Sequence, residues 1–419
     1  MQTCGRQLQC IRPNLLRKSD SYLSLPLLRE WFEILVLKSS IHKIMRKLLF
    51  FILILFSCQP DEGIEENLIQ IDLSSVKESV DNLSDFFSSI EYVMLEDSDN
   101  NPLVQPYKIV SYDSLIFVED QELDNLLIYN RSGDFLFALK SSGSGPKEFN
   151  QIEDYQVSEN SIIIKDNILM KFIEFDFSGN FVQESKHQLL SMNFAKGNSH
   201  EIHFFNNVIQ NEPYNFLTIS GSDSSYSIPI KKGFEDIVFV HQSGFTLNRK
   251  SSENFLSLPF SYDVFNFGYE GELKKRIRFN LNSLGLSEEE RLLFENQRQE
   301  PSQREFSLMI RSFYPVGENF FFNYTSNLQN SYLGLLDSDY SLSKIGKNPT
   351  NDLDGFPLIL VPWSYHEEGL ILKLPSRRIA AYISNRSPVE EIKSNLVSFV
   401  KAHRDEFNSD RHVLVFLNR

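Results

Sequence analysis

One sequence unit occurs twice in succession between Asn125 and Ser185, and this repeat constrains the fold more than any other feature of the chain. In each copy an apolar segment leads into a turn that contains glycine, and a second apolar segment follows. Gly133 and Gly179 occupy matching turn positions and lie 46 residues apart. That interval is about the length of one four-stranded propeller blade. The spacing therefore predicts an all-β, bladed architecture.

Further strand-like segments, separated by turn residues, extend this pattern along the chain. The first predicted blade has strands at 107–110, 115–118, 126–129 and 135–139, and the second has strands at 152–157, 161–165, 170–175 and 181–183. Later blades are predicted at 201–231, 237–279, 320–345 and 358–383, the last with strands at 358–361, 370–373 and 379–383. Gly271 lies 92 residues after Gly179, an interval that accommodates two blades. The count is six.

Two segments before the first blade, 69–73 and 90–95, also alternate as strands. A closed propeller uses such strands to complete its last blade, which removes an open sheet edge. Two helices interrupt the strands. Ser287 and Glu290 form a capping box that predicts a helical insertion over 288–312, broken near Pro301. Ser387 and Pro388 begin a C-terminal helix, which a strand at 412–417 follows. The apolar face of that helix consists of Val389, Ile392, Leu396, Phe399, Val400 and His403.

A glycine-rich connector joins the first two blades, and its residues are Gly143, Gly145, Pro146, Glu148 and Phe149. Together with the hairpin turns at Gly133 and Gly179, this order resembles the NHL-type repeat. More closely, the stretch from about 88 to 186 resembles the six-bladed, NHL/TolB-like propeller lipoproteins of Bacteroidota. The connector lacks the Gly-Lys-Ser/Thr ending of a phosphate-binding loop, so we interpret it as a structural joint.

The N-terminal region resembles a bacterial lipoprotein signal. A basic pair follows Met45, a short apolar run extends to Phe56, and Cys58 would carry the lipid. The alternative is a genuine N-terminal extension before a core helix. The predicted organisation is an upstream or mis-assigned extension (1–44), a signal peptide (45–57), an acidic tether (58–68) and a six-bladed propeller domain (69–419). The acidic tether resembles surface-export tethers of Bacteroidota lipoproteins, so display on the outer leaflet is a further hypothesis.

The charge balance narrows the possible partners. The whole chain has a net charge of −15, and residues 1–57 hold 9 of the 41 basic and 3 of the 56 acidic residues, so the mature chain carries about −21. So acidic a surface repels phosphate backbones, and we expect no nucleic-acid partner. No cysteine follows Cys58, so no disulfide supports the mature fold.

Motifs for metal or cofactor binding are weak, and we expect neither. His200 and His203 project to opposite faces of a strand, because side chains alternate. The acidic turns at 337–339 and 352–355 lack the glycine and glutamate positions of a calcium loop.

The strongest candidates for ligand binding lie in the predicted sixth blade: Trp363, Tyr365, His366, Arg377 and Arg378. The aromatic rings could stack on a ligand and the arginines could bind carboxylate or phosphate, although packing between sheets also explains the aromatic residues. A lipid-anchored binding or scaffolding module of the cell envelope, with a glycan, peptide or protein ligand, is the favoured function. The alternatives are a lyase or hydrolase with its site in the central channel, and a structural part of an outer-membrane assembly.

Overall fold

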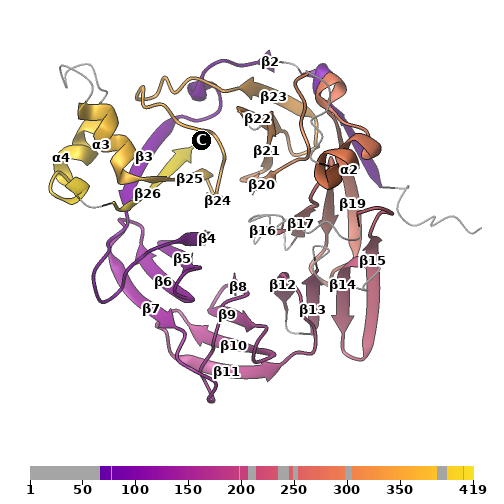
Figure 1. Cartoon of the computed structure of the whole chain (residues 1–419), viewed down its shortest axis with the longest axis vertical. Coiled ribbons are helices and arrows are strands. Elements are labelled where there is room, and N and C mark those ends of the chain that lie inside the picture. Colours follow the sequence, from indigo (N-terminus) through magenta and orange to yellow (C-terminus); the bar gives the residue numbers. More distant parts are fainter. Residues whose placement is uncertain are drawn as a thin grey trace, which may run out of the picture. The chain divides into compact units, whose positions relative to one another are not determined.

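The computed structural model describes residues 67–419, apart from 77, 198, 206–213, 235–244, 249–252, 298–303, 328, 385–393 and 409. These residues belong to one compact unit, which spans Ile64–Arg419. Within this unit six small sheets surround a common centre (Figure 1). The predicted six-bladed β-propeller is therefore confirmed.

The first three blades each contain four consecutive antiparallel strands. Blade one consists of β4 (Pro106–Tyr112), β5 (Leu115–Asp120), β6 (Asn125–Asn130) and β7 (Phe135–Lys140). Blade two consists of β8 (Asp154–Val157), β9 (Ser161–Asp166), β10 (Lys171–Asp176) and β11 (Phe181–Lys186). Blade three consists of β12 (Asn193–Lys196), β13 (His200–Phe204), β14 (Tyr214–Ser220) and β15 (Asp223–Pro229). The repeat that defined the first two blades is thus real, with Gly133 and Gly179 at equivalent turns.

The other three blades recruit strands from the N-terminal segment. Blade four contains β16 (Phe245–Asn248), β17 (Glu253–Ser257), β18 (Asp263–Phe267), β19 (Leu273–Asn280) and, at its outer edge, β1 (Leu68–Asp72). Blade five contains β20 (Ser312–Val316), β21 (Asn319–Ser326), β22 (Asn330–Leu336), β23 (Leu342–Lys347) and β2 (Glu78–Ser79). Blade six contains β24 (Ser364–His366), β25 (Gly369–Pro375), β26 (His412–Asn418) and β3 (Ser89–Met94).

The N-terminal segment therefore runs along the outer edges of three successive blades. β3 pairs antiparallel with β26, so the strand predicted at 90–95 completes the last blade as expected. The strand predicted at 69–73 does not take part in that closure. It forms β1 and pairs in parallel with β19, and β2 adds to β23 in the same way. The edges of blades four and five are consequently covered by the chain itself.

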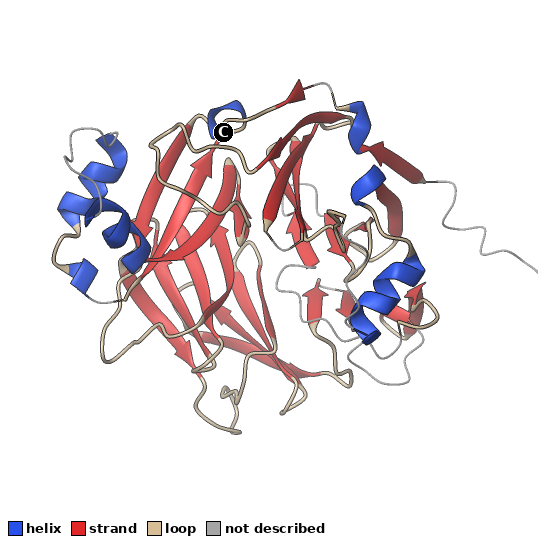
Figure 2. Cartoon of the chain, turned by 45° about the horizontal axis from the view of Figure 1, so that its top comes forward, coloured by secondary structure: helices blue, strands red, loops and turns tan. Residues whose placement is uncertain are grey.

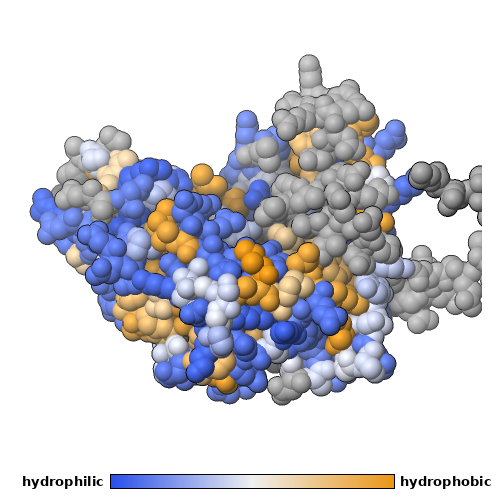
Figure 3. All heavy atoms as spheres, turned by 60° about the horizontal axis from the view of Figure 1, so that its bottom comes forward, coloured by the Kyte–Doolittle hydropathy of each residue, from blue (hydrophilic) through white to orange (hydrophobic). Residues whose placement is uncertain are grey.

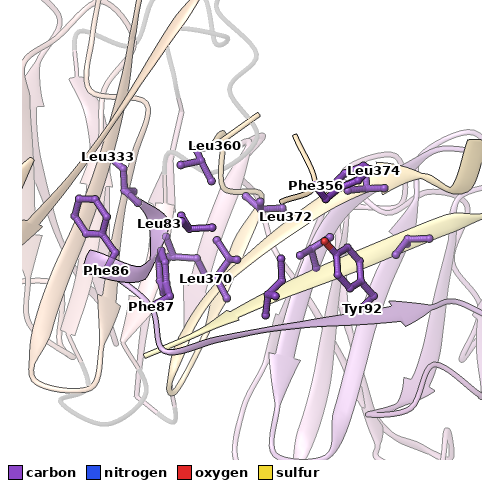
Figure 4. Packing of buried hydrophobic residues seen from close by; sticks show 14 of the residues in the cluster. Leu83, Phe86, Phe87, Tyr92, Leu333, Phe356, Leu360, Leu370, Leu372 and Leu374 are labelled. Atoms are coloured by element: carbon purple, nitrogen blue, oxygen red, sulfur yellow. The ribbon is translucent and has the colours of Figure 1, made fainter. Parts of the chain in front are cut away.

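A continuous hydrophobic cluster holds this segment against the last two blades. Figure 4 shows Leu83, Phe86 and Phe87, which precede β3, beside Leu333 of blade five and Leu370 of blade six. The rings of Phe87 and Phe321 stack with their centroids 5.2 Å apart. All these side chains are at most 3% exposed. Burial of large aromatic groups is the main stabilising contribution to this closure.

The C-terminal helices lie outside the ring of strands, as Figure 2 shows. α2 (Glu288–Gln297) follows blade four. Its predicted capping box is present: Ser287 Oγ accepts a hydrogen bond from the Glu290 amide, and the Glu290 carboxylate accepts one from the Ser287 amide. The insertion is shorter than predicted, since residues 304–311 are not helical. α4 (Ser394–Ala402) confirms the later part of the C-terminal helix, with Leu396 and Phe399 buried as expected. Ser387, Pro388, Val389 and Ile392 lie outside the described residues.

The sixth blade departs from the prediction in two places. Residues 379–383 form part of α3 (Ser376–Ser384) rather than a strand, because the two alanines favour a helix and Ile379 and Ile383 share one buried side of it. Residues 358–361 form no strand either. Pro357 and Pro362 flank this stretch, and proline cannot donate a hydrogen bond to a neighbouring strand. The innermost strand is instead the short β24.

Candidate functional site

Side chains of the innermost strands connect neighbouring blades around the centre. Lys108 Nζ on blade one donates to Asp154 and to the Tyr155 carbonyl on blade two, each at 2.6 Å. Gln156 on blade two exchanges two hydrogen bonds with the backbone of Lys196 on blade three. These contacts set the relative positions of the blades from which any site near the centre is built.

A cavity of about 60 Å³ lies in the central channel, lined by residues of blades one, two, four, five and six. Tyr365 reaches from blade six to blade four, where its hydroxyl donates to the Leu247 carbonyl, and its ring stacks on Tyr314 with centroids 5.4 Å apart. Tyr365 thus connects blade six with blades four and five beside this cavity.

The structure brings two of the five predicted ligand residues to this channel. Trp363 and Tyr365 both line the cavity. The Trp363 indole N–H donates to the Tyr107 carbonyl at 2.6 Å, and Lys373 Nζ lies 3.8 Å from the centroid of its ring. These contacts join blade six to blade one and occupy part of the indole surface. Ligand binding by Trp363 and Tyr365 stays a prediction.

The other three predicted residues are not among those that line the cavity. Burial, with the neighbouring Arg131 charge, lowers the pKa of His366 to about 4, so its ring is neutral at neutral pH. Arg377 lies on α3, where its exposed side chain pairs with Asp410 at 2.9 Å, and Arg378 donates weakly to the Pro357 carbonyl. The predicted combination of stacking rings and arginine forks is therefore not assembled in one place.

A much larger cavity, of about 620 Å³, opens between blades two, three and four. The lining side chains are mostly polar and come from all three blades. They include Gln156, Ser158, Glu159, Ser161, Glu174 and Gln183 of blade two, Lys196 and His200 of blade three, and Asn254 and Tyr269 of blade four. We name this the inter-blade cavity. Its volume lies within the range of small-molecule and peptide-residue sites.

The charged side chains that line the inter-blade cavity differ in whether they have an ionic partner. Lys196 forms an ion pair with Glu201. Burial opposes ionisation of Glu201, but hydrogen bonds from His203 and Lys196 outweigh it and lower its pKa to about 2. Glu174 accepts a hydrogen bond from Gln183 at 2.6 Å, and no ion pair involves Glu174 or Glu159 among the described residues. Lys196 is thus paired within the protein, whereas Glu159 and Glu174 have no cationic partner among the described residues.

The two histidines of β13 point to opposite sides of blade three, as predicted. His203 contacts Phe172 of blade two, whereas the His200 ring makes an edge contact with Tyr269 of blade four at 4.6 Å. Burial lowers the pKa of His200, so this ring is neutral at neutral pH. In the described part of the chain no group of three or more His, Cys, Asp or Glu side chains is arranged to hold a metal ion.

The polar groups of the glycine-rich connector already take part in hydrogen bonds within the protein. Its Gly145 amide donates to the Glu148 carboxylate at 2.8 Å, the Ser142 amide donates to the Phe149 carbonyl, and Phe149 is 2% exposed between the blades. The loop lies between β7 and β8 and is also bonded to blade two, where Glu184 accepts from the Lys147 amide and Lys171 donates to the Gly145 carbonyl. Such an arrangement suits a joint between blades.

Surface hydropathy gives no single apolar face in the view of Figure 3, where hydrophobic patches are separated by hydrophilic residues. The exposed aliphatic side chains include Val104, Ile168 and Ile359 on different loops. No helix among the described residues has the length and apolar character needed to cross a membrane.

Sequence reasoning missed Glu174, Gln183, Asn254 and Tyr269, because they come from two different blades and form no linear motif. His200 was the only cavity residue that it considered.

Solved structures were found that are similar to this chain. A protein from Bacteroides fragilis NCTC 9343, named as a candidate exported protein, aligns with a TM-score of 0.61 at 15% identity, covering 84% of this chain and 100% of its own. A member of the DUF4221 family from Bacteroides vulgatus ATCC 8482 aligns with a TM-score of 0.49 at 8% identity, covering 80% and 97%. A search of the curated proteins finds no significant match.

The family comparison covers most of the propeller. A family model described as "Domain of unknown function (DUF4934)" matches residues 68–406, which extend from β1 to just beyond α4. The chain therefore belongs to the DUF4934 family.

Proposed function

We propose that the protein is a binding module of the cell envelope and that its ligand occupies the inter-blade cavity. The observation that carries this proposal is the cavity itself: about 620 Å³ of open volume, lined by polar side chains from three blades. Polar groups that converge from rigid elements on one cavity are typical of a recognition site. The central cavity, at about 60 Å³, leaves no comparable room.

The ligand classes compatible with this lining are a glycan, a peptide or an exposed segment of an envelope protein. Each can donate and accept hydrogen bonds with the amide of Asn254, the hydroxyl of Ser158 and the carboxylate of Glu174. Tyr269, which is 49% exposed, offers a ring surface to any of them.

An envelope location is part of the proposal and rests on the N-terminal residues. The segment 45–57 has the pattern of a signal peptide and Cys58 stands where a lipidated cysteine would be; both lie outside the described residues. The Bacteroides fragilis protein of similar fold, named as a candidate exported protein, supports export. Through this lipid the propeller would be tethered to the outer membrane, on its periplasmic or its outer side.

Mass spectrometry of the mature N-terminus tests the anchor. We expect a chain that begins at a diacylated Cys58, and loss of both processing and membrane association in Cys58→Ser. A mature chain that retains residues 1–44 would refute the signal. Protease treatment of intact cells then reports on which membrane face the propeller lies.

A cavity-blocking variant tests the site. Gln183→Trp places a bulky ring at the cavity, and Val182→Trp is its matched control, because adjacent residues of β11 project to opposite sides. Arrays of envelope glycans and peptides should give hits that Gln183→Trp abolishes and Val182→Trp retains. Hits that neither variant affects would place binding elsewhere, and chemical turnover of a hit would assign an enzyme instead.

A further inference from the structure

We propose that the inter-blade cavity recognises a cationic peptide, with a lysine or arginine side chain held between the carboxylates of Glu159 and Glu174 and the ring of Tyr269. This inference rests on the proposed function and names the ligand class of the same site. It is argued from the charged and aromatic side chains that line the cavity, and not from the volume of the cavity alone.

The first argument is the charge of the lining. Glu159 and Glu174 both line the cavity, and neither is paired with a cation among the described residues. Among the described residues that line the cavity, Lys196 is the cation, and it is paired with Glu201. Within this described lining the carboxylates of Glu159 and Glu174 are therefore uncompensated, in a chain that is itself acidic, at −15 overall. Such a field attracts cations and repels anionic glycans or phosphates.

The second argument is the neighbouring aromatic side chain. Tyr269 stands in the turn between β18 and β19, and it is 49% exposed although its ring packs against the edge-on ring of His200. An ammonium or guanidinium group near such a ring gains a cation–π attraction, which adds to the pairing with carboxylates. A neutral sugar could stack on the same ring but could not neutralise the two carboxylates.

The third argument is a single buried nitrogen atom that makes no hydrogen bond to the described residues. His200 lines the cavity and is 4% exposed, and its Nδ1 atom makes no hydrogen bond within the described structure. The neutral state of this ring adds no positive charge that would oppose a cation. Buried polar atoms normally have partners, so an unpaired one at a cavity wall indicates a place where a bound molecule or water completes the bonding.

The remaining lining suits a peptide backbone. Asn254, 6% exposed, presents an amide, and Ser158 and Asn160 lie in the β8–β9 turn at the same cavity. Amides and hydroxyls pair with the alternating N–H and carbonyl groups of an extended chain. Recognition of the charged side chain and of the backbone would therefore come from the same three blades.

Fluorescence polarisation with the full chain tests this inference. The probe is a short labelled peptide that carries lysines, compared with the same peptide after acetylation of every lysine and with an unlabelled neutral oligosaccharide as competitor. We expect the lysine peptide to bind, the acetylated peptide to bind at least about tenfold more weakly, and added salt to weaken the binding.

Two cavity variants and one control complete the experiment. Glu174→Gln keeps the shape of the side chain and should weaken binding about fivefold, and Tyr269→Leu should weaken it to a similar degree. Glu122→Gln removes the same charge from an exposed loop at the opposite end of the strands and should change nothing.

The outcomes separate this inference from the proposed function. Equal binding of the acetylated peptide, or a Glu174→Gln variant that binds normally, overturns the cationic ligand. A neutral oligosaccharide that binds instead, and loses affinity with Gln183→Trp, also overturns it while leaving the cavity as the binding site. Absence of binding by all probes overturns the inference, and array hits insensitive to Gln183→Trp overturn the site itself.

Discussion

Gly133 packs so closely on the closing strand that a β-carbon at its position would lie 2.1 Å from the carbonyl oxygen of Met94. The glycine also has a φ of +92°, in the left-handed region. Gly133 belongs to blade one and Met94 to β3, the strand that completes blade six. The turn that marks the sequence repeat is therefore also a contact between the first and last blades.

Gly133→Ala should destabilise the propeller by about 2–4 kcal/mol, because it adds a clash with backbone to the cost of the left-handed conformation. Gly221→Ala is the control: its φ is +60°, but no atom lies within 4 Å of the added carbon. There we expect a loss of about 1 kcal/mol. Urea unfolding measures both, and equal losses would contradict the role of the Met94 contact.

Asp166 is a buried carboxylate that organises the loops at one end of blade two. It accepts hydrogen bonds from the amides of Asn150, Ile168 and Leu169 at 2.7–2.8 Å. Asp120 occupies the matching position in blade one, 46 residues earlier, and also accepts from backbone amides of the loops around it.

Asp166→Asn should cost about 1–3 kcal/mol, because the new amide N–H₂ cannot accept from at least one of these amides. Asp113→Asn, at an exposed turn with φ +50°, makes the same chemical change and should alter stability by at most about 0.5 kcal/mol. If thermal or urea unfolding showed no difference between the two variants, the loop-capping role of Asp166 would be wrong.

Glu305 should make stability depend on pH in the acid range. Hydrogen bonds from Lys347 and Ser326 lower its pKa from 4.5 to about 2. Because the folded-state pKa lies below the unfolded value, these contacts stabilise the fold fully above about pH 4.5, and their contribution is lost as pH falls toward 2.

Glu305→Gln should flatten the stability profile between these pH values, whereas Glu318→Gln, at an exposed turn, should leave it as in the unaltered chain. Urea midpoints measured across the acid range provide the comparison. Parallel profiles for all three proteins would show that Glu305 contributes nothing.

Trp363 distinguishes the two cavities. In a Trp31→Phe background it is the remaining tryptophan of the chain. Its indole lies at the central cavity and not among the lining residues of the inter-blade cavity. A lysine peptide that binds as proposed should therefore leave the emission of Trp363 nearly unchanged. A large change in emission, abolished by Tyr365→Ala, would instead favour the site predicted from Trp363 and Tyr365.

Hydrogen bonds between residues close together in the sequence explain which parts of the fold could be predicted. The turn of blade one depends on Asn130, whose side chain accepts the amides two and four residues later, and Asp176 does the same in blade two. Because all the groups involved lie within five consecutive residues, the sequence shows the motif directly, and with it the blade length and the propeller. The capping box at Ser287 was predictable for the same reason.

The inter-blade cavity could not be predicted in this way, because residues far apart in the sequence form it. Glu174, His200 and Tyr269 lie on different blades, and only the register of β10, β13 and β18 with their partners directs them to one space. The pairing of β1 with β19 likewise joins segments about two hundred residues apart, such as Leu68 and Arg276. Sequence alone thus determined the repeating unit, whose hydrogen bonds are local, whereas tertiary structure decided the site, because long-range strand pairing determines which side chains meet.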